Sequence, residues 1–233
     1  MSLISLTKSV FQWACLLSLA LFLVACQTPS KVIDRGSTGK WLSDPKVFKS
    51  GYKEHSSLSQ WRYSAKVGVV TPEESNQANM IWQFESAASQ QKNGQQANTE
   101  QATNVVRLFG PLGIGAIKIE FDDQSVQLSD RTGILHKGNS AENLLHRIVG
   151  WPIPVEALQY WLFSLPQPEK QFEYQLDEHG QLQVLRQFGW EIDYSDYRDY
   201  RNNAQFLARK IIAKKQASPD QEVTVTLVTK TWK

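Results

Sequence analysis

The stretch Val105–Phe121 reads VVRLFGPLGIGAIKIEF and predicts a β-hairpin around which the rest of the chain can be arranged. Both arms are apolar and rich in β-branched residues, as strands are. The turn contains Pro111, which fixes its own φ, and three glycines, which permit the positive φ of tight turns. Turns are usually polar, yet this one carries Leu112 between Pro111 and Gly113. The pattern predicts a stiff turn whose leucine either projects as an apolar probe or folds back onto the core.

Alternating apolar residues on both sides of this hairpin predict further antiparallel strands. Trp61–Val69 and Met80–Phe84 alternate before it, and Val223–Leu227 alternates near the C-terminus. The segment 206–215 fits a helix or a strand, because its periodicity does not decide between them. Asp193–Asn203 is rich in Tyr, Asp, Arg and Asn, which favours a loop.

Three helices are expected between and before the strands. Asp44 and Pro45 can start the first, which reaches about Ser59. Ser140 can cap the second, which Gly150 ends, and the third runs between two prolines, Pro154 and Pro166. Helices placed between runs of strands can lie across one face of an antiparallel sheet.

The N-terminal region is typical of an exported lipoprotein. Lys8 precedes the apolar run Phe11–Ala25, which is too short to span a bilayer and resembles a secretory signal. The run ends in Leu-Val-Ala-Cys26, which resembles the bacterial lipobox, whose cysteine is lipidated; an ordinary signal peptide with an incidental cysteine is the alternative. Gln27 follows, where an aspartate would favour retention at the inner membrane. We therefore expect a signal peptide at 1–25, a flexible tether at 26–40 and one domain at 41–233.

Composition and motifs argue against enzymatic chemistry and nucleic-acid binding. The net charge is only +2, without the basic blocks that follow a phosphate backbone. Cys15 lies in the segment expected to be removed and Cys26 would carry lipid, which leaves no disulfide and no thiolate cluster. No two of the four histidines have the spacing of helical metal ligands, and no G-x-S-x-G elbow occurs. We expect no metal, no cofactor and no catalytic residue.

Several motifs together resemble the LolB family of outer-membrane lipoprotein receptors. They are the turn Gly110–Gly113, the run WPIP at Trp151–Pro154 with the following Leu158-x-x-Trp161, and Trp190–Tyr194. The closing strand, which ends in Trp-Lys, and the lipobox agree with this resemblance, which covers about Trp61 to Lys233. It implies a mainly β fold with α: an incomplete antiparallel β-barrel, or half-barrel, covered by about three helices that enclose an apolar cavity. Two segments depart from the family pattern, a Gln/Asn-rich insertion at Ser86–Asn104 and the stretch near Tyr194–Asn203.

The resemblance also implies a function and partners. Such receptors accept acylated lipoproteins from the soluble periplasmic carrier LolA and insert them into the outer membrane. The expected partners are therefore LolA, the lipoproteins bound to it with their acyl chains, and the outer membrane. The protein would be a lipid-anchored monomer that faces the periplasm of a Gram-negative cell. The family has a protruding leucine needed for membrane delivery, which matches Leu112, flanked here by Pro111 and Gly113.

An acyl-chain cavity would be lined by apolar side chains of the strands and the third helix. The expected lining residues are Trp82, Phe84, Ile119, Phe121, Leu158 and Trp161. Exposed acyl chains cost roughly 25 cal/mol per Å² in water, so their transit between membranes requires an apolar shelter. The same residues would also form a solid core. A structural or assembly lipoprotein of the outer membrane, acting by protein contacts with a filled core, is therefore the alternative.

Overall fold

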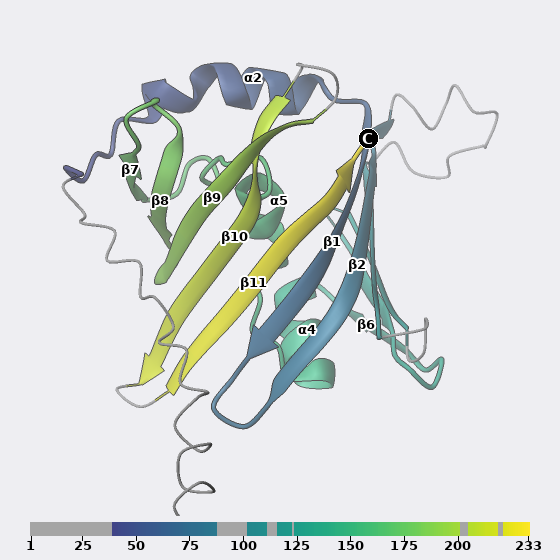
Figure 1. Cartoon of the computed structure of the whole chain (residues 1–233). Coiled ribbons are helices and arrows are strands. Elements are labelled where there is room, and N and C mark those ends of the chain that lie inside the picture. Colours follow the sequence, from purple (N-terminus) through teal and green to yellow (C-terminus); the bar gives the residue numbers. More distant parts are fainter. Residues whose placement is uncertain (1–38, 88–101, 111–115, 123, 201–204, 219–220) are drawn as a thin grey trace, which may run out of the picture. The chain divides into compact units, whose positions relative to one another are not determined.

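The computed structural model describes residues 39–87, 102–110, 116–122, 124–200, 205–218 and 221–233. Eleven antiparallel strands form one sheet in the order β6-β5-β4-β3-β2-β1-β11-β10-β9-β8-β7. Their bounds are β1 Gln60–Val70, β2 Ser75–Glu85, β3 Thr103–Phe109, β4 Ile117–Phe121, β5 Val126–Ser129, β6 Leu135–Gly138, β7 Glu173–Leu176, β8 Leu182–Gln187, β9 Trp190–Tyr200, β10 Gln205–Ser218 and β11 Gln221–Trp232. The edge strands β6 and β7 do not pair, so the curved sheet stays open, as Figure 1 shows. This confirms the predicted half-barrel.

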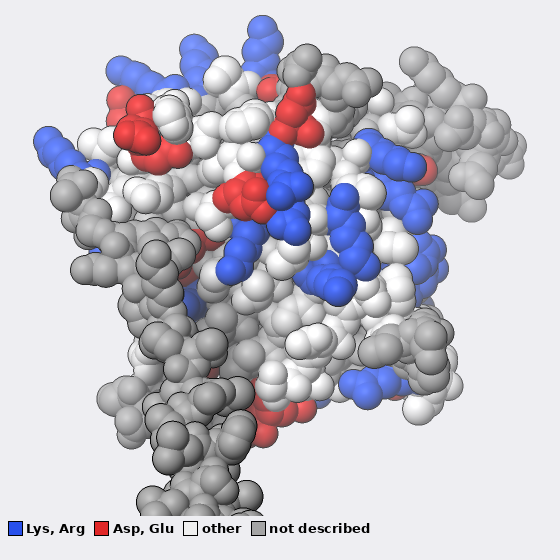
Figure 2. Space-filling view, viewed as in Figure 1, with Lys and Arg blue, Asp and Glu red and all other residues white. Residues whose placement is uncertain are grey.

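The alternation of apolar and polar residues produces the two faces of this sheet. In β1 the side chains of Trp61, Tyr63, Ala65, Val67 and Val69 are buried, while those between them are exposed or half-buried. Figure 2 shows acidic and basic side chains interspersed on the face of the sheet that points away from the helices. The sheet therefore buries one face and exposes the other to water.

In the C-terminal half the structure resolves one open alternative and contradicts one prediction. The ambiguous segment 206–215 belongs to β10, which pairs with β9 on one side and with β11 on the other. The loop predicted at Asp193–Asn203 is wrong as far as Tyr200, because β9 continues to that residue. In β9 the rings of Tyr194 and Tyr197 pack with the core while Asp196 between them is exposed, so a polar composition did not prevent strand formation.

The three predicted helices are present. They are α2 (Lys49–Ser57), preceded by the 3₁₀ helix η2 (Pro45–Phe48), then α4 (Ala141–Val149) and α5 (Val155–Trp161). The Asp44 side chain accepts a hydrogen bond from Lys46 N at 2.9 Å, and Ser140 Oγ accepts one from Asn143 N at 3.2 Å. Gly150 ends α4 with φ +83°, a left-handed conformation that glycine adopts without strain.

The helices lie at two places on the sheet. Figure 1 shows α4 and α5 on the inner side of the curved sheet, and α2 across the end at which β1 begins. At that end Trp61 contacts Phe84 and Trp232 with ring centroids 5.6 and 5.5 Å apart. We call this cluster the aromatic end; its members are Trp61, Tyr63, Trp82, Phe84, Phe163 and Trp232. It closes the interior on the side of α2.

Candidate functional site

The interior between the sheet and the helices is almost completely filled. One void of about 20 Å³ remains beneath α4, the segment Trp151–Pro154 and α5. Its lining comes from five central strands and the helical layer: Val67, Met80, Trp82, Val106, Leu108, Ile119, Leu145, Trp151, Ile153, Val155, Leu158, Val225 and Leu227. A void of this size holds about one water molecule, and apolar walls give a water too few partners. In this state the interior has no room for an acyl chain.

The structure brings three of the six expected cavity residues together. Trp82, Ile119 and Leu158 line the void. Phe84 and Phe121 do not line it; the ring of Phe84 packs against Trp61 and that of Phe121 against Trp82. Trp161 lies elsewhere, with its ring 6.3 Å from that of Trp190.

Several residues that line the void were not among those expected from the sequence. Met80 and Leu108 are cross-strand partners, and so are Val67 and Leu227. The alternation of their strands could have identified them, because they occupy the same inward-facing positions as the expected tryptophan and isoleucine. Trp151 and Ile153 come from the WPIP run, in which two prolines prevent a helix and leave these side chains buried against the sheet.

Hydrogen bonding separates the buried tryptophans into two groups. Trp82 Nε1 donates to Asn104 Oδ1 at 2.9 Å, and Trp161 Nε1 donates to Gln187 Oε1 at 3.0 Å. The indole N–H groups of Trp151, Trp190 and Trp232, by contrast, are buried and have no acceptor within the part of the chain that the structure describes. Leaving a buried donor unpaired costs roughly 1–3 kcal/mol. Trp151 lines the void, but the surface that the lining exposes to the void is entirely apolar.

Apolar contacts hold α4 on the edge of the sheet. Ala141, Leu144 and Leu145 are its buried residues. Leu144 packs so closely on β6 that a Cβ added to Gly138 would lie 3.1 Å from Leu144 Cγ. Burial raises the pKa of the Glu142 carboxyl, and the nearby Lys215 opposes that rise. Among the described residues, no ion pair joins this helix to the sheet.

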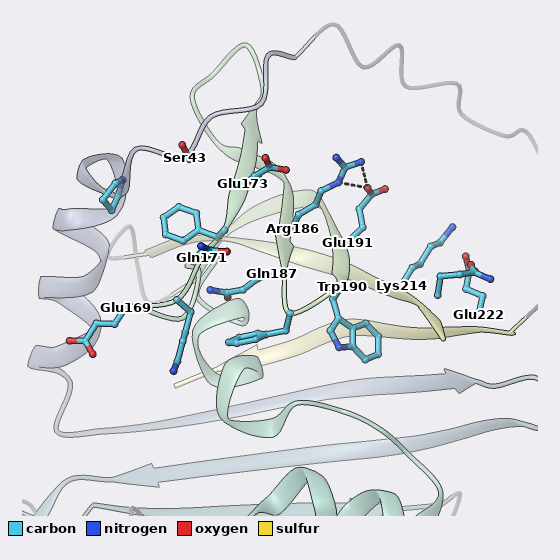
Figure 3. A pocket seen from close by; sticks show the side chains of 16 residues that line it. Ser43, Glu169, Gln171, Glu173, Arg186, Gln187, Trp190, Glu191, Lys214 and Glu222 are labelled. Carbon is cyan, nitrogen blue, oxygen red and sulfur yellow. Dashed lines mark hydrogen bonds and ion pairs between the residues drawn. The ribbon is translucent and has the colours of Figure 1, made fainter. Parts of the chain in front are cut away.

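A second hollow is much larger but has a different character. An open groove of about 1190 Å³ lies beside η2 and the β8–β9 turn, as Figure 3 shows. Its rim carries the ion pair Arg186–Glu191, with 2.8 Å between Nη2 and Oε2. The Arg186 guanidinium also lies 3.8 Å from the ring centroid of Trp41. Lys214 and Glu222 add further charge, so this groove does not provide a dry environment for hydrocarbon.

Two parts of the expected site lie outside the described residues: the lipidation residue Cys26, and the membrane-inserting residues Pro111, Leu112 and Gly113. The strands that lead into that turn are described, and Leu108 of β3 pairs with Ile117 of β4. β3 therefore ends, and β4 begins, at the end of the sheet opposite the aromatic end. Among the described residues, no group of His, Cys, Asp and Glu could hold a metal ion, and no helix has the length and apolar content to cross a bilayer.

The fold has counterparts among solved structures. A candidate outer membrane lipoprotein-sorting protein domain from Vibrio parahaemolyticus superposes with a TM-score of 0.53 at 10% identity, over 81% of this chain and 90% of that one. A DUF1329 family protein from Desulfovibrio piger superposes with a TM-score of 0.50 at 4% identity, over 82% of this chain and 93% of that one. At such low identities these similarities show the fold alone.

Sequence comparisons identify the family. The outer-membrane lipoprotein LolB of Pseudomonas paraeruginosa is 28% identical over 189 residues, which cover 81% of this chain and 82% of that protein. The LolB of Cellvibrio japonicus is 29% identical over 192 residues, or 82% of this chain and 86% of that protein. The family model described as outer membrane lipoprotein LolB matches residues 59–232, and the chain therefore belongs to the LolB family.

Proposed function

We propose that this protein accepts acylated lipoproteins from the periplasmic carrier LolA and inserts them into the outer membrane. Membership of the LolB family supports the transport role. The observation that carries the acyl-binding part is the void beneath α4, whose lining exposes only apolar surface. Acyl chains would enter there, between the sheet and the helices.

Because the interior is filled, the acyl chains bind only when α4 and the segment Trp151–Pro154 move away from the sheet. The contacts that would be lost are apolar, mainly those of Leu144 and Leu145. An acyl chain that enters replaces them with equivalent contacts, so the apolar area exposed to water changes little. Transfer to a bilayer then lets the helix return to the sheet, and this closing favours release.

The unpartnered indole N–H of Trp151 gives this site a polar group suited to its ligand. The acyl chains of a lipoprotein are attached through ester and amide groups, whose carbonyl oxygens accept hydrogen bonds. We expect Trp151 Nε1 to donate to such a carbonyl when the site is occupied, which would satisfy a donor that the closed interior leaves unpaired. The remainder of the chain would lie among the apolar side chains.

The turn that contains Leu112 is proposed to deliver the acyl chains to the membrane. A large aliphatic side chain on a Pro- and Gly-containing turn can enter the apolar part of a bilayer without ordering a long segment. The test is Leu112→Glu in an assay that follows transfer from LolA to outer-membrane vesicles. We expect normal binding of a fluorescent fatty acid and loss of insertion, whereas unchanged insertion would remove Leu112 from the mechanism.

A structural lipoprotein with a permanently filled core is the alternative function. The filled interior of this structure favours it as a description of the resting state. Displacement of a fluorescent fatty acid separates the two functions, because a core that never opens binds none. Lipid that co-purifies with the protein would give the same answer.

A further inference from the structure

The connection between β5 and β6 presents two adjacent large apolar side chains to solvent. Ile134 is 58% exposed and Leu135 is 48% exposed. Among the exposed large hydrophobic residues of the described chain, these two alone are neighbours in sequence. Single exposed apolar residues are common on protein surfaces, but an adjacent pair at a turn requires an explanation.

Hydrogen bonds make this turn rigid. Asp130 Oδ1 accepts from the backbone N–H groups of Thr132 and Ile134 at 2.9 and 3.0 Å, and from the Thr132 hydroxyl at 2.7 Å. Asp130 Oδ2 lies 2.9 Å from His136 Nε2. Gly133 supplies the left-handed conformation at the tip, with φ +85°. The backbone of the turn is therefore held in one conformation, and binding through the two exposed side chains would require little further ordering of the chain.

The sheet places this turn beside the start of β4. Lys118 of β4 pairs with Ser129 of β5, and Ser129 pairs with Leu135 of β6. Neighbouring strands lie about 4.8 Å apart, so the turn lies next to the end of the sheet at which β4 begins. Val70, also exposed, ends β1 at this same end, opposite α2 in Figure 1.

The charges around the pair fit a lipid surface. Arg131 and Lys137 are exposed on either side of the two apolar residues. The carboxylate of Asp130 accepts hydrogen bonds within the turn, and Glu73 and Glu74 belong to a different connection, the turn between β1 and β2. Apolar side chains flanked by cations suit the bilayer interface, where hydrocarbon lies beneath phosphate groups. Two side chains are too few for a stable protein interface, which buries about 800 Å² on each partner.

We propose that Ile134 and Leu135 form a second membrane contact, which inserts into the interface of a bilayer containing anionic phospholipid. This inference rests on the proposed function, because it assumes that the protein works at a membrane. It adds an orientation, in which the edge strands β5 and β6 face the bilayer. Since β6 leads directly into α4, the helix over the void would then lie next to the membrane that receives the acyl chains.

The test places an environment-sensitive nitrobenzoxadiazole label on Leu135→Cys in the full chain. The protein is reconstituted with vesicles of phosphatidylethanolamine and phosphatidylglycerol. We expect the emission to shift to the blue and to be quenched by brominated acyl chains. The matched control is a label on Val47→Cys, which is also 48% exposed but lies on η2 next to α2, and it should stay in water. The parent chain without an added cysteine gives the background from Cys15 and Cys26.

A second variant measures the contribution to insertion. Ile134→Ser combined with Leu135→Ser should lower lipoprotein insertion about tenfold and leave fatty-acid binding unchanged, because the void lies elsewhere. A label at Leu135 that stays in water in the presence of vesicles would overturn the proposal. A blue shift that appears without vesicles and grows with protein concentration would mean that the surface binds another copy of the chain. That result would also overturn the proposal. The Leu112→Glu test is separate, so the failure of either idea leaves the other identifiable.

Discussion

Trp82 and Trp151 border the same void, but only one of them has a hydrogen-bond partner. Trp82 belongs to the aromatic end, where ring contacts and its bond to Asn104 hold the side chain in place. Trp151 lies in the segment before α5, and its N–H finds no acceptor among the described residues. Regions whose buried polar groups are paired resist opening more than regions held by apolar contacts alone. We therefore propose that the interior opens on the side of Trp151 and α4. The indole N–H of Trp232, at the aromatic end, is also unpaired, so ring contacts rather than hydrogen bonds hold that end.

The largest expected effect comes from truncating each side of the void in turn. Trp82→Ala should lower the free energy of unfolding by about 4 kcal/mol, because it leaves a large cavity and an unpaired Asn104. Leu145→Ala, beneath α4, should lower it by about 2–3 kcal/mol and enlarge the void. Urea unfolding measures both changes, and fatty-acid titration should show tighter binding only for Leu145→Ala. Equal losses of stability with weaker binding in both variants would remove the distinction between the two sides.

Lowering the pH should lower the free energy of unfolding through His55, which packs against the aromatic end. This residue lies on α2 with its ring 4.7 Å from that of Phe163, and burial lowers its pKa from 6.5 to about 4. Between those values the unfolded chain binds more protons than the folded one, so stability falls as the pH drops through this window. The free energy of unfolding falls by up to about 3 kcal/mol across this window. Urea unfolding at pH 7 and pH 4 measures it, and His55→Leu should reduce the difference by that amount; an unchanged difference would contradict the assignment.

A matched pair of substitutions compares partnered and unpartnered indoles directly. Trp161→Phe removes the donor to Gln187 and should lower stability by about 2 kcal/mol more than Trp151→Phe, which removes a donor without an acceptor. Trp151→Phe should instead weaken binding of a fluorescent acyl ester about fivefold to tenfold, with binding of a hydrocarbon of equal length unchanged. Thermal unfolding and the two titrations measure these effects. A similar weakening for both ligands would assign Trp151 a packing role only.

The smallest expected effect concerns the void itself. Val106→Ile adds one methyl group next to a void of about 20 Å³. At about 24 cal/mol per Å³, filling it should raise the free energy of unfolding by about 0.5 kcal/mol. Val126→Ile is the control, because Val126 is buried but does not line the void, and overpacking there should lower stability by about 1 kcal/mol. If urea unfolding shows that both variants are less stable than the parent protein, the void cannot accept even a methyl group.

The sequence predicted the sheet and the helices because their signals are local. Alternation identified β1 and β2, and Ser140 with Gly150 marked both ends of α4. The continuation of β9 to Tyr200 was missed because its polar composition imitates a loop, while pairing with β10 and the burial of its tyrosine rings decide its conformation. Pairing across both edges likewise made β10 a strand.

The site was less predictable because it depends on packing in three dimensions. Leu158 and Trp161 are three residues apart on α5 and share a face in sequence, yet only Leu158 reaches the void. Trp161 is directed instead toward Gln187 of β8, a contact across 26 residues that no local pattern shows. Alternation shows which side chains point inward. Whether those side chains leave a void depends on how their volumes fill the space, and alternation carries no information about that.

The central claim is that acyl chains enter when α4 leaves the sheet, and a reversible cross-link tests it most directly. A Cβ on Gly138 would lie 3.1 Å from Leu144 Cγ, close to the separation of about 3 Å between Cβ and the distal sulfur of a disulfide. Gly138→Cys combined with Leu144→Cys should therefore join α4 to β6 when oxidised, and Gly138→Cys alone controls for other thiols. We expect the oxidised protein to bind no fluorescent fatty acid and the reduced protein to bind it again. Equal binding in both forms would contradict the account.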